Sequence, residues 1–287
     1  MMIGTRGSIL AMRQTEIFIE MMNKVHPTED CVVKEIKVSG DIDQVSQLHE
    51  LQGFGAFVRE LDDALTKGII DVSVNSMKDM PIESKQNVVI PAILPRASVA
   101  DVIIPVPLNE IPFGAVIGTS SLRRTATVKQ IRPDLIIKPL RGNIQTRIRK
   151  LKDGEYDAII LAKAGLDRTG ENVPYAVMDV NEMTPAPAQG AIAIACRGDD
   201  IETIRKLSAV DDPKTRTEVT LEREIMKATG AGCTSPIGIN ASLNGNEIQL
   251  RANSFIGRSP VRLYEVLPKD YSEEDVKRIA FELRGSS

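Results

Sequence analysis

Residues 115–124 read Ala-Val-Ile-Gly-Thr-Ser-Ser-Leu-Arg-Arg, an apolar strand that turns into the start of a helix. The helical pattern continues until shortly before Pro133. A strand at 135–138, a helix at 143–152 and a strand at 156–162 follow in the same alternation. Alternating strands and helices are typical of parallel α/β sheets.

Two short segments of this region recur near the start of the chain. Ile3-Gly4-Thr5 matches Ile117-Gly118-Thr119, and Gly68–Val72 matches Gly154–Ala158. Such an internal repeat predicts two related halves, although chance similarity between α/β sequences is the alternative. The spacing between the two matches differs, which places a longer loop around 40–55 in the first half.

The rest of the pattern completes the first half and adds a third part. A strand at 102–106 is predicted before the pattern restarts after Pro112. In the first half, helices are predicted from Leu10 to Pro27 and at 57–67, with strands at 31–38, 71–74 and 87–94. An apolar strand at 191–196 returns to this half. A helix at 215–227, a hairpin at Asn244-Gly245 and a helix at 273–283 indicate a small α+β domain. The predicted domains are 1–92 with 191–208, 96–186, and 213–287.

Composition excludes several classes of protein. The net charge of −3 gives no global basic field for nucleic acid. We find no secretory signal and no apolar run long enough to span a membrane, and three cysteines argue for a reducing compartment. No Cys or His pair has metal-ligand spacing, so no metal site is expected. With only two histidines, acid–base chemistry falls to Asp, Glu or Lys.

The turn after the quoted strand predicts an anion site. A helix N-terminus offers unpaired N–H groups and partial positive charge. Thr119, Ser120 and Ser121 add hydroxyl donors, and Arg123 and Arg124 add guanidinium groups that match carboxylate or phosphate. The alternative is that one serine is only a helix cap, which explains one hydroxyl of the three.

Similar turns follow other predicted strands. Arg6 and Ser8 occupy the equivalent turn of the first half, and Arg141, Asn143 and Arg147 begin another helix. Ligands of α/β sheets bind beyond the carboxyl ends of strands, so these turns are expected to converge on one cleft between the halves.

The turn Ser76-Met77-Lys78-Asp79 places a lysine and an aspartate at the same kind of edge. A carboxylate among arginines stays ionised, and it can stabilise a developing cation or carry a proton. The alternative is a capped turn with an exposed ion pair.

One cysteine lies in an unusual setting. Cys233 belongs to the glycine-rich loop 229–236, whereas Cys31 and Cys196 lie in strand patterns as core thiols. Small neighbours leave room for an adduct on the Cys233 sulfur, although loop cysteines are often incidental.

Taken together, these segments resemble the porphobilinogen deaminase (hydroxymethylbilane synthase) family. The matching motifs cover nearly the whole chain: Thr5–Ser8, Ser76–Asp79, Gly118–Arg124, Leu140–Asn143 with Arg147, Gly154–Ala162, Ala164–Leu166 with Arg168, Gln189–Ala191, and Gly232-Cys233 with Pro236–Gly238.

The resemblance implies a fold and an activity. It implies three domains, of which the first two resemble type II periplasmic binding proteins. It implies a cytoplasmic monomeric transferase that joins four porphobilinogen units head to tail into hydroxymethylbilane, with release of ammonia, for tetrapyrrole and heme biosynthesis. Partners other than porphobilinogen, such as nucleic acid or a membrane, are not expected.

The resemblance also implies residue roles. The product grows on a dipyrromethane cofactor bound through a thioether to Cys233, and Asp79 is the catalytic aspartate. The carboxylate-binding residues are Arg6, Ser8, Lys78, Thr119, Ser120, Ser121, Arg123, Arg124, Arg141, Arg147 and Arg168. Further cleft candidates are Ser76, Asn143, Gln189 and Phe57.

The chain departs from the family pattern at three positions. Phe54 and Glu50 stand where many members carry basic residues, and Ala188 stands where a glycine often precedes Gln189. The C-terminal part is also short, which predicts a trimmed third domain.

Two other functions fit parts of the pattern. A non-catalytic anion-binding module explains the arginine turns but gives no role to Cys233, Asp79 or the third domain. The ligand-binding domain of a transcriptional regulator is disfavoured because no helix-turn-helix segment precedes Ile3.

Overall fold

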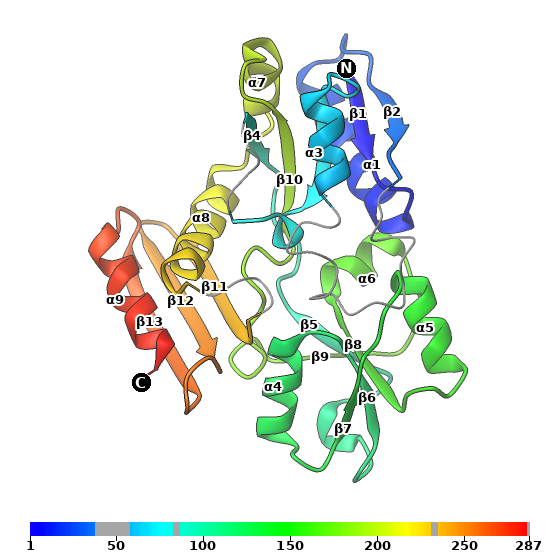
Figure 1. The fold of residues 1–287 in the computed structure, drawn as a ribbon, viewed down its shortest axis with the longest axis vertical. Helices are drawn as coiled ribbons and strands as arrows, with labels where there is room; N and C mark the ends of the chain where they lie inside the picture. Colours follow the sequence, from blue (N-terminus) through cyan, green and yellow to red (C-terminus); the bar gives the residue numbers. More distant parts are fainter. Residues whose placement is uncertain (38–57, 83–86, 231–234, 286–287) are drawn as a thin grey trace. The chain divides into compact units, whose positions relative to one another are not determined.

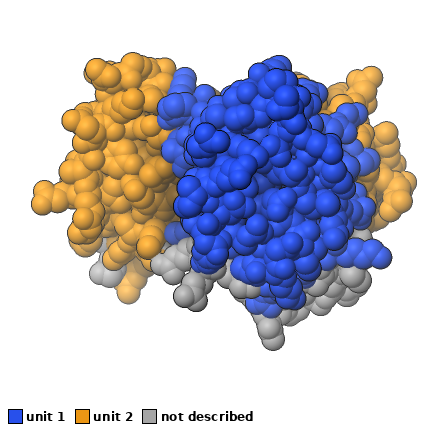
Figure 2. Space-filling view, turned by 90° about the horizontal axis from the view of Figure 1, so that it is seen from above, with its two compact units in different colours: residues 1–97, 190–216 blue, residues 98–189, 217–287 orange. Residues whose placement is uncertain are grey.

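The computed structural model describes residues 1–37, 58–82, 87–230 and 235–285 of the chain (Figure 1). Glu50, Phe54, Phe57, Cys233 and the loop around 40–55 lie outside the described residues, and so do the predictions made for them. The chain divides into two compact units, Met1–Ala97 with Gly190–Arg216, and Ser98–Gln189 with Thr217–Ser287 (Figure 2).

The first unit is built on a five-stranded sheet with the order β2-β1-β3-β10-β4. Its strands are β1 (Met2–Thr5), β2 (Val32–Glu35), β3 (Val72–Ser76), β4 (Val88–Ile93) and β10 (Ile192–Arg197). Strands β2 and β3 run parallel to β1, whereas β10 runs antiparallel to β3 and β4. The prediction that residues 191–196 return to the first half is therefore confirmed.

The helices of this unit are α1 (Ile9–Val25), α3 (Arg59–Thr66) and α7 (Ile201–Ser208). The Ser8 hydroxyl caps the start of α1 by accepting a hydrogen bond from the Ala11 N–H, and the helix ends at Val25, with His26 as its C-cap just before Pro27. Phe18 and Met22, one turn apart on α1, are fully buried against Ile3 and Val74 of the sheet.

The second unit contains a sheet with the order β7-β6-β8-β5-β9. Its strands are β5 (Asp101–Ile104), β6 (Val116–Gly118), β7 (Ile136–Lys138), β8 (Ala158–Ala162) and β9 (Ala176–Val177). Helices α4 (Leu122–Ile131), α5 (Ile144–Lys152) and α6 (Lys163–Thr169) accompany them. Strand β8 alternates between two cores: Ile160 packs with Val128 of α4, whereas Ile159 and Leu161 pack with Ile148 and Leu166.

The two sheets repeat one arrangement, as the internal sequence repeat predicts. In each, the first strand lies between two parallel neighbours, and an antiparallel strand from elsewhere in the chain follows the third strand. An aspartate before the third strand accepts a hydrogen bond from a backbone N–H at the first: Asp71 from Met2 at 2.7 Å, and Asp157 from Val116 at 2.7 Å. Such detailed correspondence excludes chance similarity.

The C-terminal residues form an antiparallel sheet of β11 (Ile237–Asn244), β12 (Glu247–Ser254) and β13 (Val261–Pro268). Helix α8 (Pro213–Ala228) precedes the sheet, and α9 (Glu273–Arg284) packs against β12 and β13. Gly245 takes a positive φ of 62° in the predicted Asn244-Gly245 hairpin.

The fold class is therefore α/β, as predicted, with two five-stranded sheets of the same arrangement and a small antiparallel sheet that is accompanied by helices α8 and α9. The resemblance of the two α/β sheets to type II periplasmic binding proteins stays a prediction. The second compact unit contains both the β5–β9 sheet and the β11–β13 sheet, and the predicted domain boundaries stay a prediction. No helix in the described ranges is long and apolar enough to cross a membrane.

Candidate functional site

The carboxyl ends of three parallel strands carry most of the predicted anion-binding residues of the second unit. Strands β7 and β8 both run parallel to β6, so all three end at the same edge of the sheet. After β6 come Thr119, Ser120 and Ser121, after β7 come Arg141, Asn143 and Arg147, and after β8 comes Arg168 on α6.

Two of these residues are helix caps. The Ser121 hydroxyl oxygen accepts from the Arg124 N–H at the start of α4, and the Asn143 side-chain oxygen accepts from the Thr146 N–H at the start of α5. Ser121 is therefore the serine that caps α4. A hydroxyl that accepts in a cap can still donate its own proton, so capping does not exclude ligand binding.

The other two hydroxyls after β6 stabilise the turn. Ser120 Oγ donates to the Leu140 carbonyl at 3.0 Å and accepts from the Leu140 N–H at 3.1 Å, which joins the turns after β6 and β7. Thr119 Oγ1 accepts from the Ser121 N–H at 3.2 Å. These contacts fix the backbone N–H groups that begin α4.

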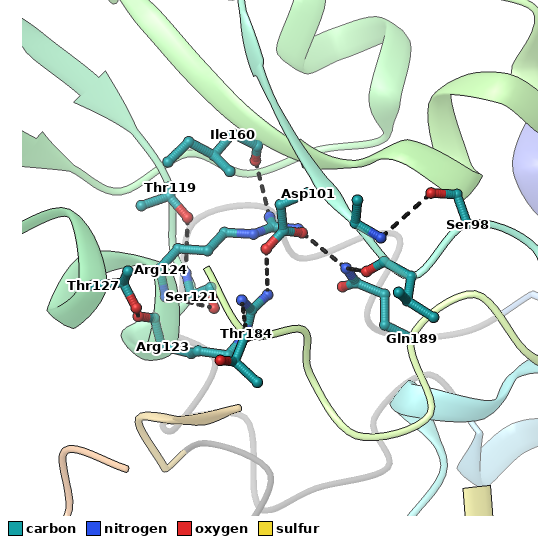
Figure 3. Close-up of polar contacts among 12 residues, drawn as sticks. Ser98, Asp101, Thr119, Ser121, Arg123, Arg124, Thr127, Ile160, Thr184 and Gln189 are labelled. Atoms are coloured by element: carbon teal, nitrogen blue, oxygen red, sulfur yellow. Dashed lines mark hydrogen bonds and ion pairs between the residues drawn. The ribbon is translucent and has the colours of Figure 1, made fainter. Parts of the chain in front are cut away.

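Arg123 and Arg124 share one buried carboxylate. Arg123 Nη2 lies 2.8 Å from Asp101 Oδ2, and Arg124 Nη2 lies 2.7 Å from Asp101 Oδ1 (Figure 3). Arg123 Nη1 also donates to the Thr184 carbonyl and Arg124 Nη1 to the Ile160 carbonyl. The two side chains are almost fully buried, with 5% and 8% of their surface exposed, and Asp101 is completely buried.

The charges of this cluster depend on one another. Burial opposes ionisation of Asp101, but Arg123 and Arg124 outweigh it, so the pKa of the Asp101 carboxyl lies well below its usual value. Burial, together with the like charge of Arg124, lowers the pKa of Arg123, and Asp101 acts against this shift. Sequence reasoning missed Asp101, although an aspartate at the start of an apolar strand is a signal of a buried charge.

The remaining arginines of this edge are less deeply buried. Arg141 and Arg147 are half-buried, and Arg147 Nε donates to the Gly142 carbonyl at 2.7 Å. Burial lowers the pKa of Arg168 to about 10, so this guanidinium is still protonated at neutral pH.

The first unit has a smaller group at the equivalent edge. Strands β1 and β3 are parallel neighbours, and their ends carry Arg6 with Ser8, and Ser76 with Lys78 and Asp79. Lys78 and Asp79 are half-buried in a 3₁₀ turn (Met77–Asp79).

Sequence reasoning missed Gln14 of α1, whose Nε2 donates a hydrogen bond to Ser76 Oγ at 2.8 Å and so joins α1 to the end of β3. Its signal in the sequence is a polar residue on the buried face of an amphipathic helix.

Gln189 reaches Asp101 from the side opposite the arginines (Figure 3). Its Nε2 donates to Asp101 Oδ1 at 2.9 Å and to the Val99 carbonyl at 2.7 Å. The preceding Ala188 has a φ of 61°, and its N–H donates to Glu222 Oε2 at 2.6 Å. This left-handed backbone gives a physical reason for a glycine before Gln189.

The structure thus places the predicted residues at two sheet edges, one in each unit. Phe57 and Cys233 lie outside the described residues. Convergence of the two edges on one cleft, and the binding role of each residue, stay predictions.

Comparison with known proteins assigns the chain to a family. The model "Porphobilinogen deaminase, dipyromethane cofactor binding domain" matches residues 1–205, and "Porphobilinogen deaminase, C-terminal domain" matches residues 216–260. The chain belongs to the porphobilinogen deaminase family. Both α/β sheets of this family member, including the arginine cluster, fall within the first match.

Several known proteins are similar in sequence to most of this member of the porphobilinogen deaminase family. A probable porphobilinogen deaminase of Methanosarcina acetivorans is 43% identical over 93% of this chain and 86% of its own length. The probable enzyme of Nitrosopumilus maritimus is 41% identical, over 88% of this chain and 82% of its own. The porphobilinogen deaminase of Streptococcus sanguinis is 42% identical over 87% of this chain and 84% of its own length.

Proposed function

We propose that this chain is a porphobilinogen deaminase, a transferase that joins four porphobilinogen units into hydroxymethylbilane and releases ammonia. The observation that carries the proposal is the sheet edge of the second unit, where helix N-termini and arginines gather at the ends of β6, β7 and β8. Each porphobilinogen has two carboxylates, so the growing chain is densely anionic. Bidentate arginines and helix N-termini suit such a ligand.

The residues also fit a dipyrromethane, which has carboxylates of the same kind. Among the described residues, the Nε atoms of Arg123 and Arg124 are buried and have no hydrogen-bond partner. A buried donor without a partner is costly, and an anion relieves this cost. Thr119, Ser120, Ser121, Arg123, Arg124, Arg141, Arg147 and Arg168 would hold the carboxylates, with Cys233 as the attachment point. When bound, the group supplies the pyrrole end on which the product grows.

Asp79 is the proposed acid–base residue. Loss of ammonia from porphobilinogen leaves a resonance-stabilised cation, and a carboxylate close to it lowers its energy. The Asp79 carboxyl protonates the leaving amine and its carboxylate later accepts the proton of the pyrrole ring. Lys78, Arg6 and Ser8, at the same edge, hold substrate carboxylates.

Intact-mass spectrometry tests the proposal directly. The purified chain should be heavier than its sequence by two linked pyrrole units, because the attached cofactor keeps intermediates bound through repeated cycles. Cys233→Ser should have the sequence mass and should lack activity. Cys31→Ser, which changes a half-buried thiol of the first unit, is the matched control and should keep the added mass. A fully active wild-type chain of unmodified mass refutes the attachment of the cofactor to Cys233, whereas a chain that does not consume porphobilinogen refutes the proposed function.

The same proposal describes a monomer that acts in the cytoplasm. Light scattering on the purified chain measures its molar mass in solution, and a dimer mass contradicts the first point.

A further inference from the structure

Asp101 has an unusual set of partners for a buried carboxylate. Each of its oxygens faces a different guanidinium, at 2.8 Å for Arg123 and 2.7 Å for Arg124. Each guanidinium is also anchored at its other terminal nitrogen by a backbone carbonyl, Thr184 for Arg123 and Ile160 for Arg124. The carboxylate therefore holds two like charges side by side in one fixed arrangement.

The charges of this cluster do not cancel. Two guanidinium groups and one carboxylate leave one net positive charge, buried within the second unit. The described residues provide no hydrogen-bond partner for either Nε–H. An arrangement for stability alone would favour a balanced pair, because an uncompensated buried charge is costly. The surplus charge instead favours an additional anion.

Asp101 is itself held by a neutral group. Gln189 Nε2 donates to Asp101 Oδ1 at 2.9 Å and to the Val99 carbonyl at 2.7 Å. Gln189 is almost fully buried, so its amide has little freedom. The position of the carboxylate is therefore fixed by a contact that adds no charge to the cluster.

We propose that Asp101 is a positioning residue for the proposed reaction, on which this inference rests. Its carboxylate aligns Arg123 and Arg124 and cancels one of their charges, so that the pair acts on one carboxylate of the pyrrole chain as a single, fixed positive charge. Asp101 acts through the two arginines and does not touch the substrate.

The decisive variant is Asp101→Glu, which keeps the charge and moves the carboxylate by one methylene. We expect the KM for porphobilinogen to rise about tenfold with kcat within about threefold, because small displacements of positioning groups are costly. We also expect a smaller fraction of purified chain to carry the mass of the cofactor. In Asp101→Asn, the two guanidinium groups have no carboxylate between them. We therefore expect a larger rise in KM and a larger fall in the cofactor-bearing fraction than in Asp101→Glu.

Asp134→Asn is the matched control, because Asp134 pairs with Arg132 in the same unit at 2.7 Å and outside the candidate site. It should leave KM and the cofactor-bearing fraction at wild-type values. The proposal is overturned if Asp101→Glu does not fold, or if it lowers the unfolding temperature and leaves KM unchanged. Either result shows that Asp101 serves stability.

A lower KM in Asp101→Asn also overturns the proposal, because it shows that added charge matters more than alignment. A wild-type chain that does not consume porphobilinogen refutes the proposed function itself. If the wild-type chain consumes porphobilinogen and the Asp101 variants have the same KM and cofactor-bearing fraction as Asp134→Asn, only the role of Asp101 is refuted.

Discussion

At the scale of single residues, the two carboxylates with proposed roles, Asp79 and Asp101, lie in different settings. Asp101 is fully buried among arginines and has no access to a substrate, whereas Asp79 is half-buried in a short turn at a strand end. A group that transfers protons must come within hydrogen-bond distance of the reacting atoms. The difference in exposure supports the proposed role of Asp79 as the catalytic carboxylate and the proposed role of Asp101 as a positioning group.

Asp79→Asn tests this division. The amide keeps the shape of the side chain but cannot carry the proton, so we expect kcat to fall by about 100-fold or more while the cofactor mass is retained. Single-turnover kinetics and intact mass measure the two effects. Asp30→Asn, an exposed carboxylate of the same unit, should change neither. Near-normal turnover in Asp79→Asn removes Asp79 from the acid–base role.

At the scale of elements, the sequence predicts those helices and strands that have a repeated motif or a clear apolar periodicity. The triplets at Ile3 and Ile117 locate β1 and β6, and apolar periodicity locates α1, α5, α8 and α9 within a few residues. The two-residue strand β9 and the short helices α6 and α7 have too few residues for a periodic signal, and the sequence analysis missed them.

Side-chain partners were the harder part of the site. Asp101 meets Arg123 and Arg124 only because β5 enters the sheet beside β8, and no local pattern encodes that pairing. The N-caps at Ser8, Ser121 and Asn143 are local and follow from residue type. The turns that begin the helices were therefore predictable, whereas the charge balance among the arginines was not.

Gly118, the last residue of β6, lies where the packing leaves no room for a side chain. A Cβ on Gly118 would lie 2.8 Å from Cδ1 of Tyr156, which precedes β8, and 3.0 Å from Cγ2 of Ile159 in β8. We expect Gly118→Ala to lower the free energy of unfolding by about 1 to 3 kcal/mol through overpacking. Chemical denaturation measures this loss. In a Tyr156→Ala background the same change should cost less, and an equal cost in both backgrounds contradicts the packing argument.

At the scale of the whole molecule, the second unit joins the C-terminal sheet to the arginine cluster through a short loop. The Ile239 N–H donates to the Pro185 carbonyl at 2.9 Å, and the Thr184 carbonyl accepts from Arg123 Nη1 at 2.8 Å. On α8, Glu222 accepts from the Ala188 N–H at 2.6 Å and from the Ala241 N–H at 2.7 Å. The β11–β13 sheet is therefore in direct contact with the backbone segment that anchors Arg123.

Gly238→Ala tests whether this contact matters for function as well as stability. A Cβ at Gly238 would lie 2.3 Å from the Thr184 carbonyl oxygen, a backbone atom that cannot turn aside. We expect a loss of about 3 kcal/mol in the free energy of unfolding, together with a higher KM, because the displaced carbonyl also orients Arg123. Gly245→Ala is the control: its added Cβ meets nothing within 4 Å, and only its positive φ of 62° is strained. That strain costs about 1 to 2 kcal/mol and should leave KM unchanged. Equal KM values for the two variants, measured on folded protein, would show that the loop supports the C-terminal sheet alone and that Arg123 keeps its position without it.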